Sequence, residues 1–400
     1  MNPNPCIMWA APFCLHDSSS GAAIEVKLML EQLASRGLRC HALSALVFDA
    51  ENGSAPFVNL DKQLETQPDA KWFDLDDNGV SYQYYRTKSR HIDDMTRGEE
   101  NDFLRMFYAN LERVRPDAVM LFGASALEIA IMAESRRRGI KVCSCVFNGN
   151  YTNYSFPYSD LLLTDSELSA QKYFESSRIN IMPTGVFLDT KRVVVKATME
   201  PKYITFVNPV PAKGISMLMR LALMAKKTHP DWHFLVLESR GTWMQALTMY
   251  NQNTKDYTNV SITRHTMDMR LVYQQTKLLL VPSLWYEGFG RVAAEAILNG
   301  IPVLASTSGG LPHTVNGGGM NVDAPENCVQ DYMYFPTEIE CGAWFKALEH
   351  MMDQAHFGQW QEKARAASII HDIERNTDRL LSYLMPLLTT RASLHPHYFM

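Results

Sequence analysis

Two glutamates, Glu287 and Glu295, stand at the ends of a glycine-rich segment with the sequence EGFGRVAAE. Glycines let backbone N–H groups approach a ligand closely, and the helix that follows directs its positive dipole end toward a phosphate. The carboxylates can accept hydrogen bonds from sugar hydroxyls, Glu287 at one end of the ligand and Glu295, about a turn and a half into the helix, at the other. This spacing favours a nucleotide sugar as ligand. The plainer alternative is an exposed loop and helix with incidental acids.

A second candidate for phosphate binding is Lys213, which stands with Gly214 between a strand pattern at residues 203–207 and a helix that begins at Ile215. The lysine ammonium and the N-terminal amides of that helix could neutralise a pyrophosphate. When a sugar leaves a diphosphate, stabilising the departing anion is the main electrostatic task of the site. An exposed lysine at a helix start is the alternative.

Together these segments resemble the retaining glycosyltransferases of family 4, the group 1 glycosyltransferases with an E-x7-E motif. The similarity includes FVNPVPAKG at residues 206–214, SGGLP at 308–312 and TGVFLD at 184–189, with a weaker likeness over about residues 6–370. The resemblance implies the GT-B fold, an α/β architecture of two Rossmann-like, doubly wound domains that face each other across a cleft. It also implies transfer from a nucleoside diphosphate sugar to a glycan, lipid-linked or small-molecule acceptor. The implied reaction is hexosyltransferase-type, retaining and metal-independent, with no cofactor.

The resemblance implies roles for individual residues as well. The expected catalytic residues are Glu287, Lys213 and Arg291. Glu295 is expected to hold the ribose hydroxyls. The other expected donor contacts are Gly21, Asn208, Gly288, Phe289 and Gly290, of which Phe289 could equally be a core aromatic residue.

Several positions depart from the family pattern. Asn208 stands where family members commonly have an arginine, and Arg291 is the candidate replacement for the missing cation. Asn148 stands in place of a histidine near the donor sugar, so its amide could bond a hydroxyl but could not transfer a proton. His16 is the candidate substitute for that histidine. Gly21 is the one glycine of the loop SSSGA, which suits a helix-capping serine loop as well as a phosphate loop.

Two other functions stay open beside glycosyl transfer. A sugar-nucleotide epimerase on the same fold would need an acid and base pair near the sugar, which the sequence does not present. A catalytically weak nucleotide-sugar-binding subunit would agree with Asn208 and Asn148. For the transferase, no residue stands out as a covalent nucleophile. We therefore expect a front-face transfer in which the leaving phosphate accepts the acceptor's proton.

Length and patterning predict two domains. A chain of 400 residues with 46% hydrophobic and 20% charged residues exceeds a single ordinary core. Short apolar runs alternate with helical periods, which predicts parallel α/β units in domains at residues 1–183 and 202–371, joined by a linker at 184–201. By the resemblance, helices after about residue 372 pack back on the first domain. Residues 50–100 are polar and poorly periodic, so we predict an irregular insertion or acceptor-facing loops there.

Charge and cysteine content limit the partners and the compartment. A net charge of −5 gives no general attraction to nucleic acid. The basic run at residues 136–138 falls at the end of a predicted helix, which leaves at most a peripheral contact with an anionic membrane. The seven cysteines have no regular spacing and are predicted to be buried, reduced thiols. With no signal-peptide pattern and no apolar run near ~20 residues, we expect a cytoplasmic protein.

Overall fold

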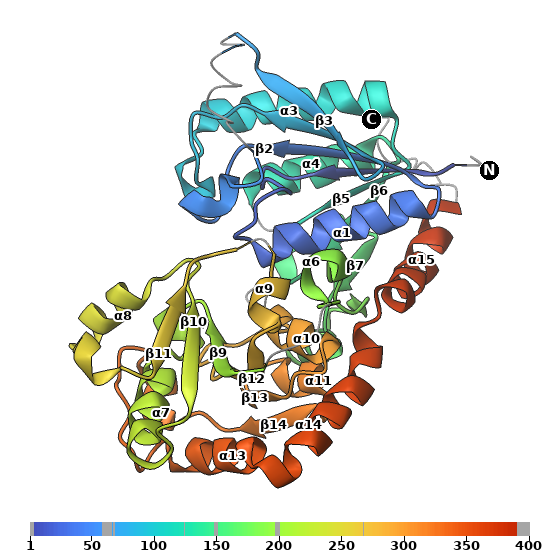
Figure 1. Cartoon of the computed structure of the whole chain (residues 1–400). Helices are drawn as coiled ribbons and strands as arrows, with labels where there is room; N and C mark the ends of the chain where they lie inside the picture. Colours follow the sequence, from blue (N-terminus) through green and yellow to red (C-terminus); the bar gives the residue numbers. More distant parts are fainter. Residues whose placement is uncertain are drawn as a thin grey trace. The chain divides into compact units, whose positions relative to one another are not determined.

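The structure is a computed structural model that describes residues 4–57, 66, 69–123, 125–147, 151–196, 201–266 and 268–389. The chain divides into two compact units (Figure 1). The first consists of Met1–Phe187 with Ile373–Met400, and the second of Leu188–Asp372. The division between Phe187 and Leu188 falls inside the segment predicted as linker, residues 184–201. Helix α15 at the end of the chain belongs to the first unit.

The first unit is built on an eight-stranded sheet with the order β3-β4-β2-β1-β5-β6-β7-β8. Every neighbouring pair is parallel except β3 and β4, which are antiparallel. The strands are β1 (Cys6–Ala10), β2 (Arg39–Ala45), β3 (Trp72–Asp77), β4 (Val80–Tyr85), β5 (Ala118–Leu121), β6 (Lys141–Cys145), β7 (Leu161–Thr164) and β8 (Met182–Pro183). The central strands are buried because helices cover both faces, as in other parallel sheets.

Helices lie on both faces of this sheet (Figure 1). Helix α1 packs with α15 on one face, and α3 packs with α4 on the other. The helices are α1 (Gly21–Ser35), α3 (Arg97–Val114), α4 (Ala126–Arg137), α5 (Glu167–Ser177) and α15 (Ile373–Thr389), with short 3-10 turns η1 (Glu51–Ser54), η2 (Ile92–Asp94) and η3 (Asn153–Ser155). Capping boxes fix the starts of α3 and α4, where the cap side chain and the third helical residue bond each other's backbone N–H.

The prediction of irregular structure over residues 50–100 is wrong for much of this segment. Strands β3 and β4 form a hairpin, and β4 extends the parallel sheet beside β2. Asn78 and Gly79 make the turn with φ values of 47° and 80°, the left-handed conformation that two-residue hairpin turns require. Apolar and polar residues alternate along both strands, so the polar residues mark the outer face of a sheet rather than a loop.

The segment where the chain leaves the first unit is hydrogen-bonded to two helices of that unit, and one of them, α15, begins where the chain returns. Glu25 of α1 is buried and accepts a hydrogen bond of 2.7 Å from the backbone N–H of Phe187. Asn376 of α15, also buried, donates a bond of 2.8 Å to the carbonyl of Val186. Gly185 has a φ of 81°, and a Cβ there would collide with the Asn376 amide. Residues 185–187 are therefore fixed between α1 and α15.

The second unit is built on a six-stranded parallel sheet with the order β11-β10-β9-β12-β13-β14. The strand order reverses between β9 and β12, and ligands of open α/β sheets bind beyond the carboxyl ends of strands at such a reversal. The strands are β9 (Tyr203–Val207), β10 (His233–Leu237), β11 (Val260–Thr263), β12 (Thr276–Val281), β13 (Val303–Ser306) and β14 (Gly319–Val322).

Alternate residues of these strands contribute to two apolar clusters, one on each face of the sheet. Leu278 and Leu280 of β12 belong to the cluster with α7 and α13, whereas Leu279 and Val281 belong to the cluster with α10 and α11. The helices are α6 (Thr190–Val193), α7 (Ile215–Thr228), α8 (Trp243–Met249), α9 (Arg270–Tyr273), α10 (Arg291–Leu298), α11 (Leu311–Val315), α12 (Glu326–Gln330), α13 (Gly342–Met352) and α14 (Gln354–Ala367), with 3-10 turns η4 (Pro211–Lys213), η5 (Thr254–Asp256) and η6 (Ser368–His371).

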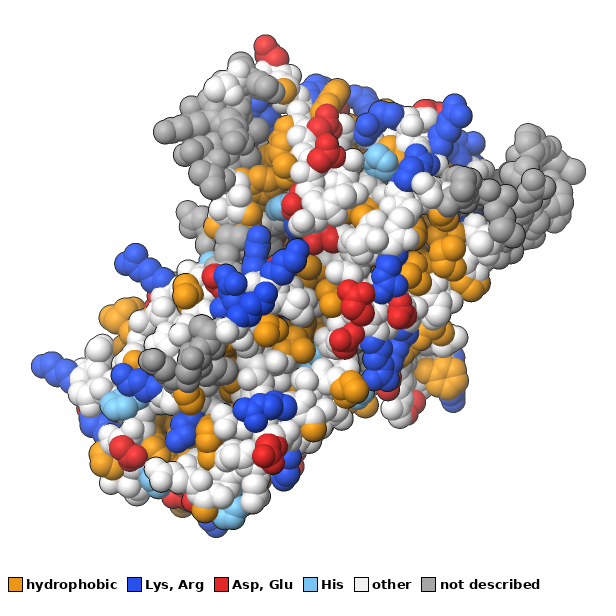
Figure 2. Space-filling model, turned by 45° about the vertical axis from the view of Figure 1, so that its right-hand side comes forward, with side chains coloured by type: hydrophobic (Ala, Val, Ile, Leu, Met, Phe, Trp, Pro, Cys, Tyr) orange, Lys and Arg blue, Asp and Glu red, His pale blue; other side chains and the backbone are white. Residues whose placement is uncertain are grey.

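The remaining sequence predictions concern the surface and the cysteines. On the face shown in Figure 2, basic and acidic side chains are interspersed with apolar ones. Arg137 and Arg138, at the end of α4, both pair with Glu134. All seven cysteines are buried, as predicted, and none is paired in a disulfide in the structure. Among the described helices, none has the length and apolar character needed to cross a bilayer.

Candidate functional site

Lys213 and Glu287 meet beyond the carboxyl ends of the two strands at which the order of the second sheet reverses. Lys213 ends the turn η4 that follows β9, and Glu287 lies in the loop that follows β12. The Lys213 ammonium is in an ion pair with Oε1 of Glu287. The carboxylate side chain is buried at 8% exposure, while the lysine side chain is 23% exposed. The pair therefore places a cation toward the solvent and its counter-charge in the interior.

Two further side chains hold this pair in place. Ser283 donates its hydroxyl hydrogen bond to the same Oε1 of Glu287. The ring of Trp285 lies under the Lys213 ammonium, 4.9 Å from nitrogen to ring centroid, which is within cation-π range. Burial raises the pKa of Glu287, but the Lys213 charge and hydrogen bonds from Lys213, Ser283 and Trp285 outweigh it and lower the pKa below its usual value. Glu287 is consequently a carboxylate.

Glycines allow the loops of the site to interlock at backbone distance. Gly214, with a φ of 79°, lies so close to Pro282 that a Cβ would collide with its carbonyl oxygen. Gly309 has a φ of 58° and lies equally close to the Glu287 carbonyl oxygen. That oxygen also accepts a hydrogen bond of 2.8 Å from the N–H of Gly310. The GGLP segment therefore packs directly on the backbone of Glu287. A larger residue at Gly214 or Gly309 would push the loops apart.

Glu295 lies in the second turn of α10 and is half-buried. Its Oε2 accepts a hydrogen bond of 2.7 Å from the hydroxyl of Tyr273, a fully buried residue of α9. Burial raises the pKa of Glu295, while the charge of Arg291 and the Tyr273 bond oppose the rise. Arg291 is the first residue of α10, and Gly290 precedes it with a φ of 90°.

Asn208 has a structural role at the end of β9. Its φ of 66° is a left-handed conformation that asparagine tolerates better than most residues. The side chain is buried, and its Oδ1 accepts a hydrogen bond of 3.3 Å from the N–H of Gly241. Asn208 thus joins the loops that follow β9 and β10 at the carboxyl edge of the sheet, and it brings no charge there.

The Phe289 side chain lies in the core, the alternative that the sequence left open. It is 5% exposed and packs edge-on against the ring of His371 at 5.6 Å. Its carbonyl accepts a hydrogen bond from the hydroxyl of Thr314. Any contact of Phe289 with a ligand would therefore come from its backbone. Gly288, the residue before it, is half-buried in the same turn.

The other predicted site residues belong to the first unit. Gly21 is the first residue of α1, and Ser20 caps that helix by accepting from the N–H of Ala23. The His16 ring bonds the Tyr84 hydroxyl through Nδ1 and Oδ2 of Asp77 through Nε2, the latter at 3.0 Å. Asn148 lies outside the described residues.

Sequence reasoning missed three residues that contact the candidate side chains. Ser283 and Trp285 stand four and two residues before Glu287, in the same loop after β12. Tyr273 is 22 residues before Glu295 and no motif marks it. A buried tyrosine usually finds a hydrogen-bond partner, but only the fold shows which one.

Comparison with known proteins agrees with this geometry. Residues 189–327 match the family described as glycosyl transferases group 1, a stretch that contains Lys213, Glu287 and Glu295. Among curated proteins, the D-inositol 3-phosphate glycosyltransferase of Corynebacterium kroppenstedtii is 34% identical over 175 residues. That match covers 40% of this chain and 38% of the relative, so it spans less than half of either protein.

Solved structures match nearly the whole chain. A glycosyltransferase from Rickettsia africae superposes with a TM-score of 0.67 at 15% identity, covering 97% of this chain and all of that one. HepE of Anabaena, solved in complex with UDP-glucose, gives a TM-score of 0.66 at 13% identity over 95% of this chain and 99% of that one. The fold is GT-B. The predicted architecture of two Rossmann-like domains is confirmed.

Proposed function

We propose that this protein is a glycosyltransferase that moves a sugar from a nucleoside diphosphate sugar to an acceptor, with retention at the anomeric carbon. The observation that carries the proposal is the meeting of Lys213, Glu287 and the glycine-rich start of α10 beyond the carboxyl ends of β9 and β12. This is where a sheet of this order binds its ligands. The segment that matches group 1 glycosyl transferases contains all three.

In this proposal Lys213 neutralises the diphosphate of the donor. Lys213 is the less buried member of the ion pair, and the first turn of α7 begins two residues later. The start of α10, with Arg291 as its first residue, supplies further N–H groups and a second cation. These groups stabilise the leaving diphosphate as the bond to the sugar breaks. On this proposal the transfer needs neither a metal ion nor a cofactor.

The two glutamates are assigned different tasks. Glu295 accepts hydrogen bonds from the ribose hydroxyls, with Tyr273 fixing its other oxygen. Glu287 orients Lys213 and faces the sugar end of the donor, where Gly288 and Gly290 offer backbone N–H groups. Because Oε1 of Glu287 already accepts from Lys213 and Ser283, this carboxylate is poorly placed as a covalent nucleophile. This supports a front-face transfer in which the leaving phosphate accepts the proton of the acceptor.

The comparisons suggest which substrates to test first. HepE was solved with UDP-glucose, and the curated relative is named for D-inositol 3-phosphate. We propose UDP-glucose and UDP as first donor-side ligands and inositol 3-phosphate as first acceptor. Other nucleoside diphosphates and simple glycans complete the panel.

A thermal-shift screen followed by a transfer assay tests the proposal. A nucleotide at about 100 times its dissociation constant should stabilise the protein by roughly 2.7 kcal/mol. Lys213→Ala should abolish transfer, whereas Lys226→Ala, a change at an exposed lysine of α7, should not. If neither a nucleoside diphosphate nor a nucleoside diphosphate sugar stabilises the protein, the proposal is rejected. Tight binding with neither hydrolysis nor transfer would instead favour the second candidate function, a catalytically weak nucleotide-sugar-binding subunit. The observation that favours this alternative is the neutral Asn208 at the carboxyl end of β9.

A further inference from the structure

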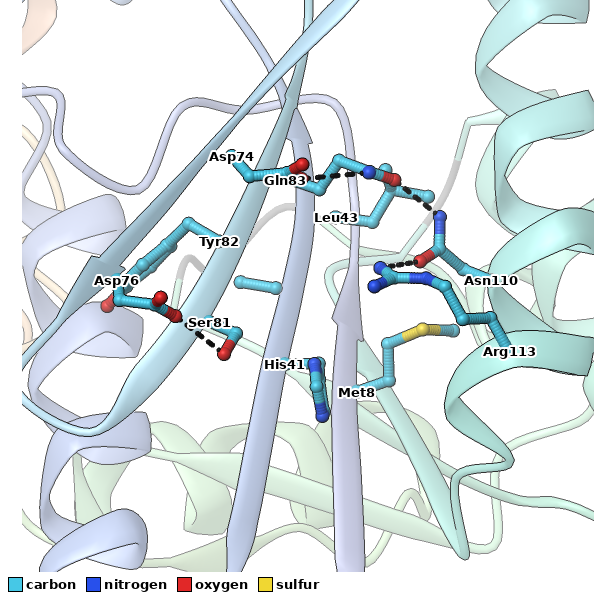
Figure 3. A pocket seen from close by; sticks show the side chains of 11 residues that line it. Met8, His41, Leu43, Asp74, Asp76, Ser81, Tyr82, Gln83, Asn110 and Arg113 are labelled. Carbon is cyan, nitrogen blue, oxygen red and sulfur yellow. Dashed lines mark hydrogen bonds between the residues drawn. The ribbon is translucent and has the colours of Figure 1, made fainter.

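A cavity of about 240 Å³ lies on the first unit, between α3 and the outer face of the sheet (Figure 3). Its floor is one row of paired residues across four neighbouring strands. Met8 pairs with His41, His41 with Ser81, and Ser81 with Asp76. Because alternate residues of a strand share a face, the next row on this side holds Leu43, Gln83 and Asp74. The cavity therefore opens on the face of the sheet, at the middle of β2 rather than at its carboxyl end.

Hydrogen bonds hold one wall of the cavity in place. Asn110 of α3 is buried and donates a hydrogen bond of 2.7 Å to the side-chain oxygen of Gln83. The amide nitrogen of Gln83 in turn donates a hydrogen bond of 2.9 Å to Asp74. Arg113, one turn further along α3, donates a hydrogen bond of 2.6 Å to the side-chain oxygen of Asn110. Figure 3 shows this chain of four side chains along the rim, with Asp76 and Ser81 bonded to each other at 2.7 Å on the opposite side. These groups keep their positions without a ligand.

The same side chains leave bonding capacity that faces the cavity. Asp74 and Asp76 each use Oδ1 internally, and no bond to Oδ2 of either is seen in the described part of the chain. The imidazole of His41 is half-buried and has no hydrogen-bond partner among the described residues. Burial, Arg113 and Arg39 lower its pKa against the opposing effect of Asp76, so the ring is neutral at pH 7 and can both donate and accept.

The mixture of charges decides which ligand fits. Two carboxylates oppose a phosphate, and Arg113 opposes a metal ion or an amine. The residues described contain no group of three metal-ligating side chains. A nucleobase would need a flat aromatic surface, but the ring of Tyr82 packs against His16 and Tyr84 instead. Hydroxyl groups suit every partner present, because they donate to carboxylates and accept from guanidinium.

The size of the cavity limits the ligand to a small one. Its volume lies below the roughly 300–1,000 Å³ of pockets that enclose drug-sized molecules. One ring with hydroxyl groups fills such a space, and the side chains of Met8 and Leu43 offer apolar surface for its carbon atoms. We propose that this cavity is a carbohydrate-binding site that holds a single neutral sugar or cyclitol ring, separate from the Lys213 site of the second unit.

Methyl NMR of the full chain tests this proposal, with the methionine methyls labelled and the Met8 signal assigned by Met8→Leu. The probes are D-glucose, D-galactose, D-mannose and myo-inositol, with inorganic phosphate and ethanolamine as charged controls. We expect at least one ring polyol, and neither control, to shift the Met8 signal saturably. Comparing D-glucose with maltotriose distinguishes a free sugar from the end of a glycan chain. A response to none of the polyols, or an equal response to phosphate or ethanolamine, would overturn the proposal.

Variants on the rim provide the second criterion. Asp76→Ala and Arg113→Ala should each weaken binding of the responding sugar about tenfold or more, since each removes a charge-assisted hydrogen bond. Arg105→Ala changes an arginine of the same helix whose side chain is 79% exposed, and should leave binding unchanged. Equal affinity in all three variants would place the bound sugar elsewhere. Because no nucleotide enters this experiment, its outcome is independent of the proposed glycosyltransferase activity.

Discussion

Lys213 and Glu287 are 74 residues apart in the sequence and form one ion pair beyond the carboxyl edge of the second sheet. The carboxylate is the buried partner, so it needs a cation beside it whether or not a ligand is present. A phosphate that approaches Lys213 from the solvent side can share its ammonium without removing it from Glu287. In the proposed function, the cation is thus in place before the donor binds, which lowers the reorganisation needed for transfer.

The first prediction separates stability from activity at this pair. Lys213→Ala leaves the Glu287 carboxylate buried and unpaired, and should lower the free energy of unfolding by about 3 kcal/mol, near the lower limit for such pairs because Lys213 is partly exposed. Adding Glu287→Gln removes the unpaired charge and should recover most of that loss, while transfer stays abolished. Chemical denaturation and a transfer assay measure the two effects. Equal stability of Lys213→Ala and the parent would contradict the prediction.

The second prediction concerns the nucleotide end of the site. Glu295→Ala should weaken binding of the nucleoside diphosphate itself by about 1.5 to 3 kcal/mol, because it removes a charge-assisted hydrogen bond to the ribose. Tyr273→Phe should weaken it by less, since it frees the Glu295 side chain without removing the carboxylate. Calorimetry with the diphosphate measures both. Lys226→Ala, a change at an exposed lysine in the last turn of α7, is the control and should leave nucleotide affinity unchanged. Unaltered affinity in Glu295→Ala would rule out the ribose assignment.

The strand β9 of the second sheet could be predicted from the sequence with correct bounds, residues 203–207. Buried parallel strands appear as short apolar runs, so their signal is local. The partners of Glu287 and Glu295 are a different matter. Lys213 was expected at the phosphate because of its motif, but its pairing with Glu287 depends on how two loops meet. Tyr273 reaches Glu295 only because α9 packs beside α10, which no local pattern encodes.

The third prediction concerns Arg291, the candidate replacement for the cation absent at Asn208. Arg291→Ala should lower kcat about tenfold or more with little change in KM, because its attraction to the leaving diphosphate strengthens as the bond breaks. Arg291→Lys should retain part of the rate. Steady-state kinetics with a saturating acceptor measure the change. A normal rate in Arg291→Ala, together with an inactive Lys213→Ala, would show that lysine and helix amides suffice.

The fourth prediction is a pH dependence of stability. His371 is buried and donates through Nε2 to the Thr314 carbonyl at 2.9 Å, while its Nδ1 has no partner among the described residues. Burial lowers its pKa to about 4, with the Thr314 bond opposing and His313 adding to the effect. The unfolded chain, with a histidine pKa of about 6.5, binds more protons between these values, so stability falls as pH drops through this window.

The loss by pH 4 should amount to about 3 kcal/mol at most, from 1.36 kcal/mol for each unit of pKa shift. His371→Gln cannot take up the proton and should show a flatter profile between pH 6.5 and 4. Denaturant unfolding of both proteins at several pH values measures the difference. Since Phe289 packs on His371, nucleotide binding should weaken in parallel in the parent protein. Identical profiles would exclude His371 as the source.

The hairpin of β3 and β4 shows why the first unit was harder to predict. Its outer face carries Asp74, Asp76, Ser81 and Gln83, so its average composition is that of a loop. The alternation with buried side chains and the Asn-Gly turn were the informative signals, because both are independent of mean polarity. The cavity beside α3 depends on this polar face and could not have been located without the strand register.

The ties of residues 185–187 to Glu25 and Asn376 have a consequence for how the chain can be cut and rejoined. The second unit has the same property, because Val193 and Val195 bond Asn299 at the end of α10 while η6 packs on α10. Residues 188–372 are in effect an insertion into the first unit. Within each unit, the segment where the chain enters lies beside the segment where it leaves. A short linker from 187 to 373 should therefore leave the first unit able to fold, and residues 188–372 should be expressible as a separate domain.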